Sequence, residues 1–129
     1  MTRQELERYI AQAFGAAAEY PWAAYPHYAV FRHGRNRKWF AVVMDIPKDR
    51  LGLQEAGEIE ILNVKCDPLL VTSLWDDPGF FPAYHMNKTN WITIALDGTV
   101  EDERILWLLD RSYDLTAPKR KKKLKNPDF

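Results

Sequence analysis

The stretch 27–46, HYAVFRHGRNRKWFAVVMDI, decides the fold class of this chain of 129 residues. Two runs rich in aromatic and β-branched residues, HYAVFRH and RKWFAVVMDI, flank the segment GRNR, which supplies the Gly and Asn that tight turns need. The pattern predicts two antiparallel strands joined in a hairpin. Strands that are hairpin-connected neighbours favour an antiparallel sheet and an α+β fold.

Capping signals mark three helices around these strands. Thr2 with Glu5 has the spacing of a capping box, so the first helix should run over about 3–14. The dipeptide Asp67-Pro68 suits the start of a short second helix. The third and clearest helix has Thr99 as its candidate N-cap. Four of its residues should face inward: Ile105, Leu108, Leu109 and Ser112.

Two further runs are expected to be strands. EIEILNVKC at 58–66 and WITIAL at 91–96 are rich in β-branched residues. The alternation in 58–66 is imperfect, so the pattern leaves open which face of that strand is buried. We therefore predict an α+β domain with a single antiparallel sheet flanked by helices, which gather on one face.

Length and composition indicate one globular domain. A chain of this length that is 47% hydrophobic can bury one core. It has no run of about 18 uncharged apolar residues, and its N-terminus is a charged helical pattern, so we expect a soluble, cytoplasmic protein that does not insert into a membrane. The domain should span 1–117, and 118–129 should be a flexible basic tail.

The charge is distributed unevenly. The tail holds 6 of the 18 basic residues and 1 of the 18 acidic residues, so 12 basic and 17 acidic residues remain in 1–117, a formal charge of −5. A basic run of this kind can bind nucleic acid through phosphate contacts, or it can simply be solvated. The candidate binding residues of the tail are Lys119, Arg120, Lys121, Lys122 and Lys123.

The second half of the chain resembles a known family. The run PAYHMNKTNWITIALDG (82–98) is preceded by VKCDP (64–68) and followed by LLDRSYDL (108–115). These segments look like the signature of the MmcQ/YjbR-like proteins, small bacterial domains commonly described as DNA-binding. The segment EYPWAAYPHY (19–28) and the basic tail are not part of that signature.

The resemblance implies an α+β fold with an antiparallel sheet flanked by helices. That fold is similar to bacterial secretion chaperones and to the double-wing DNA-binding domain of a phage transcription factor. The DNA-binding description rests on this likeness of fold, which by itself is an analogy. The resemblance implies no catalytic residues.

Tyr84, His85, Lys88 and Trp91 of the signature are candidate nucleic-acid contacts. A lysine pairs with phosphate, and aromatic faces stack on unpaired bases. Alternatively, Tyr84 and Trp91 pack against the sheet, while His85 and Lys88 shape the loop that enters the strand. The burial of these four side chains distinguishes the two interpretations.

The predicted hairpin tip is the second candidate site. A protruding basic turn can reach a phosphate backbone, and the same composition also keeps an ordinary hairpin soluble. Five residues around Gly34 form this basic cluster: Arg32, His33, Arg35, Arg37 and Lys38.

Motifs for other chemistry do not occur in the sequence. Its three histidines form no ligand pattern, its single cysteine has no partner, and no GxGxxG, P-loop or GxSxG motif is present. We expect no metal, no cofactor and no enzymatic activity, and we expect Cys66 to be a small buried hydrophobe.

The leading hypothesis is weak, phosphate-dominated DNA binding. The alternative is a protein-interaction or chaperone-like module, or a homodimer, that uses exposed aromatic side chains of PGFFPAYHM (78–86). An enzyme with a ligand cleft beside Tyr84, His85 and Trp91 is a third reading that no motif supports.

Overall fold

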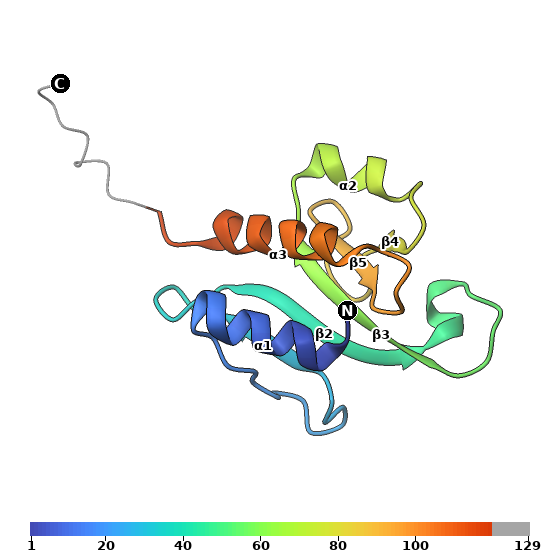
Figure 1. Ribbon diagram of the computed structural model, residues 1–129, viewed down its shortest axis with the longest axis horizontal. Coiled ribbons are helices and arrows are strands. Elements are labelled where there is room, and N and C mark those ends of the chain that lie inside the picture. Colours follow the sequence, from blue (N-terminus) through green and yellow to red (C-terminus); the bar gives the residue numbers. More distant parts are fainter. Residues whose placement is uncertain (120–129) are drawn as a thin grey trace, which may run out of the picture.

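The predicted hairpin forms the first two strands of one sheet. The computed structural model describes residues 1–119, and every structural statement below refers to these residues. Figure 1 shows the sheet, whose antiparallel strands follow the order β1-β2-β3-β5-β4. The strands are β1 (Ala29–Arg32), β2 (Trp39–Pro47), β3 (Glu58–Lys65), β4 (Phe80–Pro82) and β5 (Trp91–Ala95). The helices are α1 (Arg3–Phe14), α2 (Pro68–Leu74), α3 (Asp102–Thr116) and the 3₁₀ helix η1 (Lys48–Leu51).

All three α-helices pack on one face of the sheet, which confirms the α+β prediction. The helices bury two apolar side chains each from α1 and α2 and a longer row from α3 against the sheet. The inward row predicted for α3 is correct. The Ser112 hydroxyl in that row donates to the Phe40 carbonyl at 2.6 Å and accepts from the Lys65 amide at 2.8 Å. It thereby ties α3 to β2 and β3, and a polar side chain is satisfied in the core.

Two of the three predicted helix starts are correct. The capping box of Thr2 and Glu5 is present, and α1 ends at Gly15 with a φ of 66°. Asp67 caps α2 by accepting from the Leu69 amide. The third prediction is wrong, because Glu101 and not Thr99 is the N-cap of α3. The Thr99 amide donates to the Asp97 side chain at 3.0 Å, so Thr99 belongs to the turn that precedes the helix.

The strand β3 is buried on both faces. Leu62 and Val64 face the helices, and Ile59 and Ile61 face the opposite side. A strand in the middle of a sheet that is covered on both sides does not need a polar face. This explains why the alternation in the sequence did not identify a single buried face.

The short strand β4 was not predicted. It pairs with β5 at the edge of the sheet, where Pro82 lies opposite Ile92. A proline lacks the amide that a central strand would need, but an edge strand tolerates it. The sequence therefore did not predict β4, because it contains Pro82 and directly follows Pro78 and Gly79.

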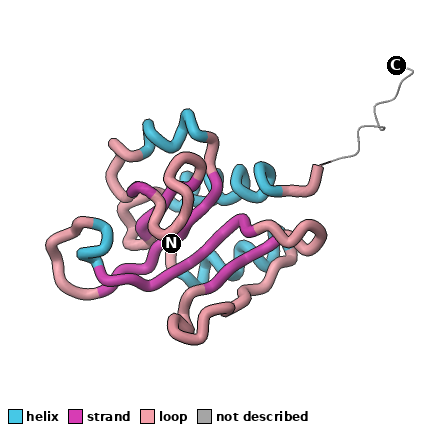
Figure 2. The backbone as a smooth tube through the Cα atoms, turned by 180° about the vertical axis from the view of Figure 1, so that it is seen from behind, coloured by secondary structure: helices cyan, strands magenta, loops and turns pink. Residues whose placement is uncertain are grey.

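Loops and side chains cover the second face of the sheet. Figure 2 shows this face from behind, with the strands in front of the helices. Seven apolar side chains of the strands lie beneath this cover: Val30, Val42, Met44, Ile46, Ile59, Ile61 and Ala95. The cover comes from three segments: 20–28, the region of Leu51 and Leu53, and the loop between β4 and β5. The segment 20–28 is irregular; Trp22 and Tyr28 are half-buried, and its other residues are exposed.

None of the helices described in residues 1–119 has both the length and the apolar character needed to cross a membrane.

Candidate functional site

The hairpin tip is only partly a free basic cluster. Arg35, Arg37 and Lys38 are exposed at the turn. Glu19 lies beside β1 and neutralises part of the cluster: its Oε1 is 3.0 Å from Arg32 Nε, and its Oε2 is 3.7 Å from Arg37 Nη2. Arg32 is therefore paired, and the tip presents mainly the other three cations.

His33 does not belong to the exposed tip. Its side chain is 4% exposed, and Nε2 lies 2.9 Å from Thr116 Oγ1 and 3.0 Å from the Tyr113 carbonyl oxygen. The Thr116 hydroxyl donates to the Ser112 carbonyl, so Nε2 must carry the proton that bonds to Thr116. Burial lowers the pKa of His33, against the opposing influence of the Tyr113 carbonyl and Asp114. Its inclusion in a phosphate-binding cluster is thus a prediction that the structure corrects.

The tip is attached to the end of α3. Asn36 Nδ2 donates to the Thr116 carbonyl at 2.9 Å, and Asn36 Oδ1 accepts from the Lys38 amide at 3.1 Å. In Figure 1 the turn between β1 and β2 and the C-terminal end of α3 lie at the same end of the protein. The exposed Lys119 follows three residues after Thr116. The predicted contacts Arg120, Lys121, Lys122 and Lys123 lie outside the described residues.

The four candidate residues of the signature have different environments. Trp91 is 8% exposed at the start of β5, so it packs into the protein, as the alternative interpretation expects. Lys88 is exposed, but its Nζ donates to the Ala83 carbonyl at 2.8 Å and closes the loop. Tyr84 is half-buried and His85 is exposed, with their ring centroids 4.1 Å apart. Only Tyr84 and His85 keep faces that a ligand could contact.

A buried polar chain holds Tyr84 on the second face of the sheet. Thr93 Oγ1 accepts from the Tyr84 amide at 2.8 Å and donates to Asn63 Oδ1. Asn63 and Thr93 are both fully buried and lie opposite each other on β3 and β5. The pair therefore determines where the loop after β4 crosses the sheet.

Tyr84 and His85 line a hollow of about 800 Å³ on this second face. Five aromatic side chains line it: Trp22, Tyr25, Tyr28, Trp39 and Tyr84. The ionisable residues around it are His27, Asp45, Arg50, Glu58 and His85. Sequence reasoning singled out only Tyr84 and His85. For Trp22, Tyr25 and Tyr28, the available signal was the density of aromatic residues and prolines in EYPWAAYPHY (19–28), the segment that forms one wall of the hollow.

The aromatic rings of the hollow meet mostly at steep angles. Trp22 is edge-to-face with Tyr28, with centroids 6.1 Å apart and planes at 77°. It is also edge-to-face with Trp39, at 5.7 Å and 87°. Tyr25 stacks on Tyr28 at 4.7 Å.

Burial raises the pKa of Tyr28, and the nearby Tyr84, Tyr25 and Asp45 add to this rise, while Arg50 opposes it. The Tyr28 phenol is therefore neutral at physiological pH.

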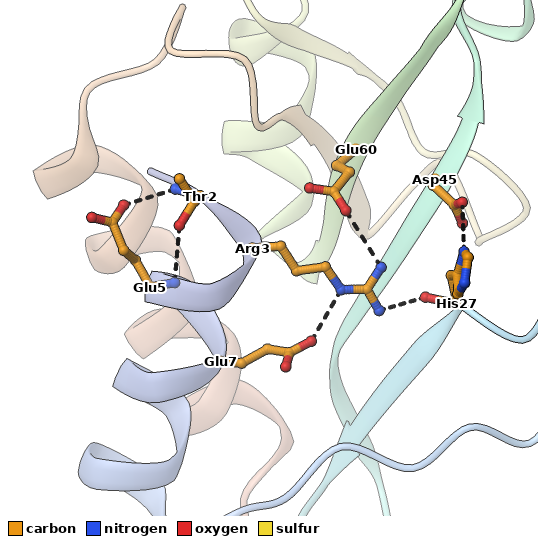
Figure 3. A network of polar contacts seen from close by, with 7 residues as sticks. All are labelled: Thr2, Arg3, Glu5, Glu7, His27, Asp45 and Glu60. Atoms are coloured by element: carbon orange, nitrogen blue, oxygen red, sulfur yellow. Dashed lines mark hydrogen bonds and ion pairs between the residues drawn. The ribbon is translucent and has the colours of Figure 1, made fainter.

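Arg3 of α1 holds this same wall, the segment 19–28, through the contacts that Figure 3 shows. Its guanidinium donates to the His27 carbonyl, to Glu7 at 3.0 Å and toward Glu60 at 3.6 Å. The His27 ring lies beside Asp45, with Nδ1 3.2 Å from Oδ2. The start of α1 thus anchors the segment that carries Trp22, Tyr25 and Tyr28.

The aromatic side chains expected to form an exposed patch in PGFFPAYHM are largely packed. Phe80 is 4% exposed, and the guanidinium of Arg104 lies over its ring at 4.7 Å. Exposed apolar side chains gather instead around a groove between α2 and α3, where Leu69 is 87% and Trp107 is 53% exposed. Within residues 1–119, exposed apolar side chains thus gather at this groove and not in PGFFPAYHM.

The described residues show no cluster of three metal-binding side chains. Cys66 is 3% exposed, and burial raises the pKa of its thiol, so it is the unreactive buried cysteine that the sequence predicted.

The chain matches one family model and is similar to proteins of two bacteria. The family model YjbR matches residues 11–115. The chain is 38% identical over 116 residues to "Uncharacterized protein YyaQ" of Bacillus subtilis (strain 168), with 90% of this chain and 98% of that protein covered. It is 41% identical over 46 residues to "Uncharacterized protein YjbR" of Escherichia coli (strain K12), with 33% of this chain and 39% of that protein covered.

Solved structures share the fold. A crystal structure of a Pseudomonas syringae protein is similar with a TM-score of 0.89 and 40% identity, and covers 91% of this chain and 100% of its own. The crystal structure of a Deinococcus radiodurans protein with a DUF419 domain has a TM-score of 0.71 and 26% identity, and covers 95% of this chain and 86% of its own. The antiparallel five-stranded sheet with its three helices is common to these structures.

Proposed function

The chain belongs to the YjbR family, and we propose that this member binds nucleic acid weakly, through phosphate contacts, where the hairpin tip meets the end of α3. One observation carries the proposal. The bond from Asn36 to the Thr116 carbonyl places the exposed Arg35, Arg37 and Lys38 next to the point where the chain continues into Lys119 and the basic run. The basic turn and the end of α3, about 80 positions apart in sequence, are thereby in contact, and Lys119 follows three residues later.

Charge supports contact with phosphate without sequence recognition. Three exposed cations at the tip join six basic residues among positions 119–125. Each phosphate neutralised by a basic side chain contributes about −0.9 to the slope of log K against log salt on duplex DNA. Such contacts position a protein but do not read the base sequence. The net negative charge of residues 1–117 opposes binding, so the affinity should be low.

The proposed phosphate-binding surface does not include the aromatic residues of the signature. Trp91 is buried, and Tyr84 and His85 border a hollow that also holds the carboxylates of Asp45 and Glu58. Carboxylates repel phosphate. Binding at the hairpin tip and the tail requires no catalytic residue, so the proposal describes a protein without enzymatic activity.

Anisotropy of a labelled DNA duplex between roughly 50 and 200 mM salt tests the proposal. The double variant R35A/K38A should weaken binding and reduce the salt slope by about 2, one unit for each lost contact. The variant R8A/R111A removes the same charge from exposed positions on α1 and α3 and should change the slope by less than half as much. Absence of binding at the lowest salt, or equal losses in both variants, would overturn the proposal.

A second candidate function is self-association through the groove between α2 and α3. Leu69, Trp107 and Leu115 are exposed there, and Asp67 and Arg111 line the same groove. A two-fold contact uses one patch twice, so Asp67 of one copy could pair with Arg111 of the other. Sedimentation velocity over a range of concentrations tests this, with Trp107→Ser expected to shift the equilibrium to monomer. A monomer at every concentration would contradict it.

A further inference from the structure

We propose that the aromatic hollow on the second face binds an organic cation, an alkylated ammonium group held against the rings of Trp22, Tyr28 and Trp39 with Asp45 as its counter-ion. This site is separate from the nucleic-acid surface, and neither proposal requires the other.

The ring arrangement suits a rounded cation better than a flat ligand. Trp22 stands nearly perpendicular to both Tyr28 and Trp39, and all three residues line the hollow, so their rings offer surfaces at different angles to a ligand there. A planar aromatic ligand prefers parallel faces on either side of it. A cation is attracted to the electron-rich face of each ring within about 6 Å of its centroid, and several walls can act on it together. Tryptophan is the strongest of these partners, and two of the three walls are tryptophans.

The charges around the hollow favour a cation. Asp45 and Glu58 carry negative charge there, and Arg50 is the only side chain of the lining that is always positive. The Asp45 side chain is 25% exposed and lies beside the His27 ring, so it is held in place yet accessible. A weakly hydrated alkylammonium loses less on entering such an apolar site than a small, strongly hydrated inorganic cation does.

The two walls are fixed from opposite sides. Arg3 holds the His27 carbonyl and with it the segment that contains Trp22 and Tyr28. The Thr93 hydroxyl holds the Tyr84 amide on the other side. A site whose walls are already in place loses little entropy when it binds. Its volume of about 800 Å³ lies in the range of small-molecule pockets and exceeds a bare tetramethylammonium, which indicates an ammonium group attached to a larger body.

Choline and its neutral isostere 3,3-dimethyl-1-butanol test the proposal, because they share a shape and differ in charge. Isothermal titration calorimetry of the full chain should show choline binding about tenfold more tightly than the isostere. Asp45→Asn keeps the size of the side chain. It should weaken choline binding about tenfold and leave the affinity for the isostere unchanged. Asp49→Asn is the control, because it removes an exposed carboxylate outside the lining of the hollow. It should leave the affinities for choline and for the isostere within about twofold of those of the parent protein.

Trp22→Leu provides a second test that leaves the charge of the protein unchanged, and it should weaken the binding of choline more than the binding of the isostere. Its folding is checked by circular dichroism, and if it does not fold, Asp45→Asn still decides the question. Equal affinity for choline and the isostere, or choline binding unchanged by Asp45→Asn, would overturn the cation site. Failure of choline to bind at about 10 mM, which corresponds to less than about 3 kcal/mol of binding free energy, would do the same.

Discussion

The backbone amide of Tyr84 donates a hydrogen bond of 2.8 Å to the hydroxyl of Thr93, which is fully buried in β5. The same hydroxyl donates to Asn63, so one side chain joins the centre of the sheet to the loop that covers it. A family signature that looked like a binding motif therefore contains a structural contact that positions its exposed residues.

Replacing Thr93 with Val should destabilise the protein by about 2–3 kcal/mol, because the Tyr84 amide and Asn63 Oδ1 both lose a buried partner. Urea unfolding measures this free energy. Thr93→Ser keeps the hydroxyl and should be destabilised by less than half as much, and Thr72→Val, at an exposed position of α2, should be nearly neutral. If Val and Ser at position 93 are equally destabilising, the hydroxyl is not the stabilising group.

The stability of the fold should depend on pH through His33. Burial lowers its pKa in the folded state below the ordinary value of about 6.5. The unfolded chain then binds a proton at a higher pH than the folded chain does. The stabilisation from neutral His33 is therefore complete above about pH 6.5, and it declines as the pH falls toward the folded pKa.

Urea unfolding between pH 5 and pH 7.5 checks this dependence. His33→Gln removes the titrating group while it keeps a donor for Thr116, so the variant should lose that part of the pH dependence. His85→Gln is the matched control, because His85 is exposed, and it should keep the slope of the parent protein. A parent slope that survives in His33→Gln would contradict the assignment.

Arg3→Met should loosen the wall of the hollow formed by residues 20–28. The substitution removes the donor to the His27 carbonyl and the pairs with Glu7 and Glu60, and should cost about 1–2 kcal/mol. Hydrogen exchange at the amides of 20–28 should become faster, and choline should bind more weakly. Arg8→Met, an exposed position on the same helix, is the control and should leave both measurements unchanged. Unchanged exchange in Arg3→Met would show that the segment is held by its aromatic packing alone.

Asn36→Ala tests whether the contact between the hairpin tip and α3 matters for nucleic acid. It removes no charge, but it releases the turn from the Thr116 carbonyl and should cost about 1 kcal/mol of stability. If the proposed surface needs the tip and the tail together, DNA binding should fall about threefold, since the cations no longer share a fixed position. Asn87→Ala, which removes a similar turn amide after β4, should not affect DNA binding. Equal DNA affinity in both variants would separate the tip from the tail.

The fold was largely predictable because its signals are local. The capping box at Thr2, the turn between β1 and β2 and the inward row of α3 each depend on residues a few positions apart. Prediction failed where a residue's role depends on its neighbours in the folded protein. Thr99 was predicted to be an N-cap, but its amide donates to the Asp97 side chain in the turn before α3, and Glu101 is the N-cap. The strand β4 was hidden because only its place at the sheet edge makes Pro82 acceptable.

The candidate site was less predictable than the fold. The sequence showed that Arg35, Arg37 and Lys38 are basic, but not that Asn36 would join their turn to α3 through Thr116. It showed Trp22 and Trp39 as two aromatic residues 17 positions apart, not as perpendicular walls. It treated His33 as one more cation of the tip, although that side chain is buried against Thr116.

The sequence by itself determined the α+β class, the hairpin, the helix boundaries set by caps and the family, because periodicity and capping act between neighbours along the chain. The tertiary structure alone decided which polar groups are buried, which cations meet and where aromatic rings enclose a hollow. These features join residues up to about 80 positions apart. Their burial and pairing depend on how the loops cross the sheet, and no local pattern in the sequence records that crossing.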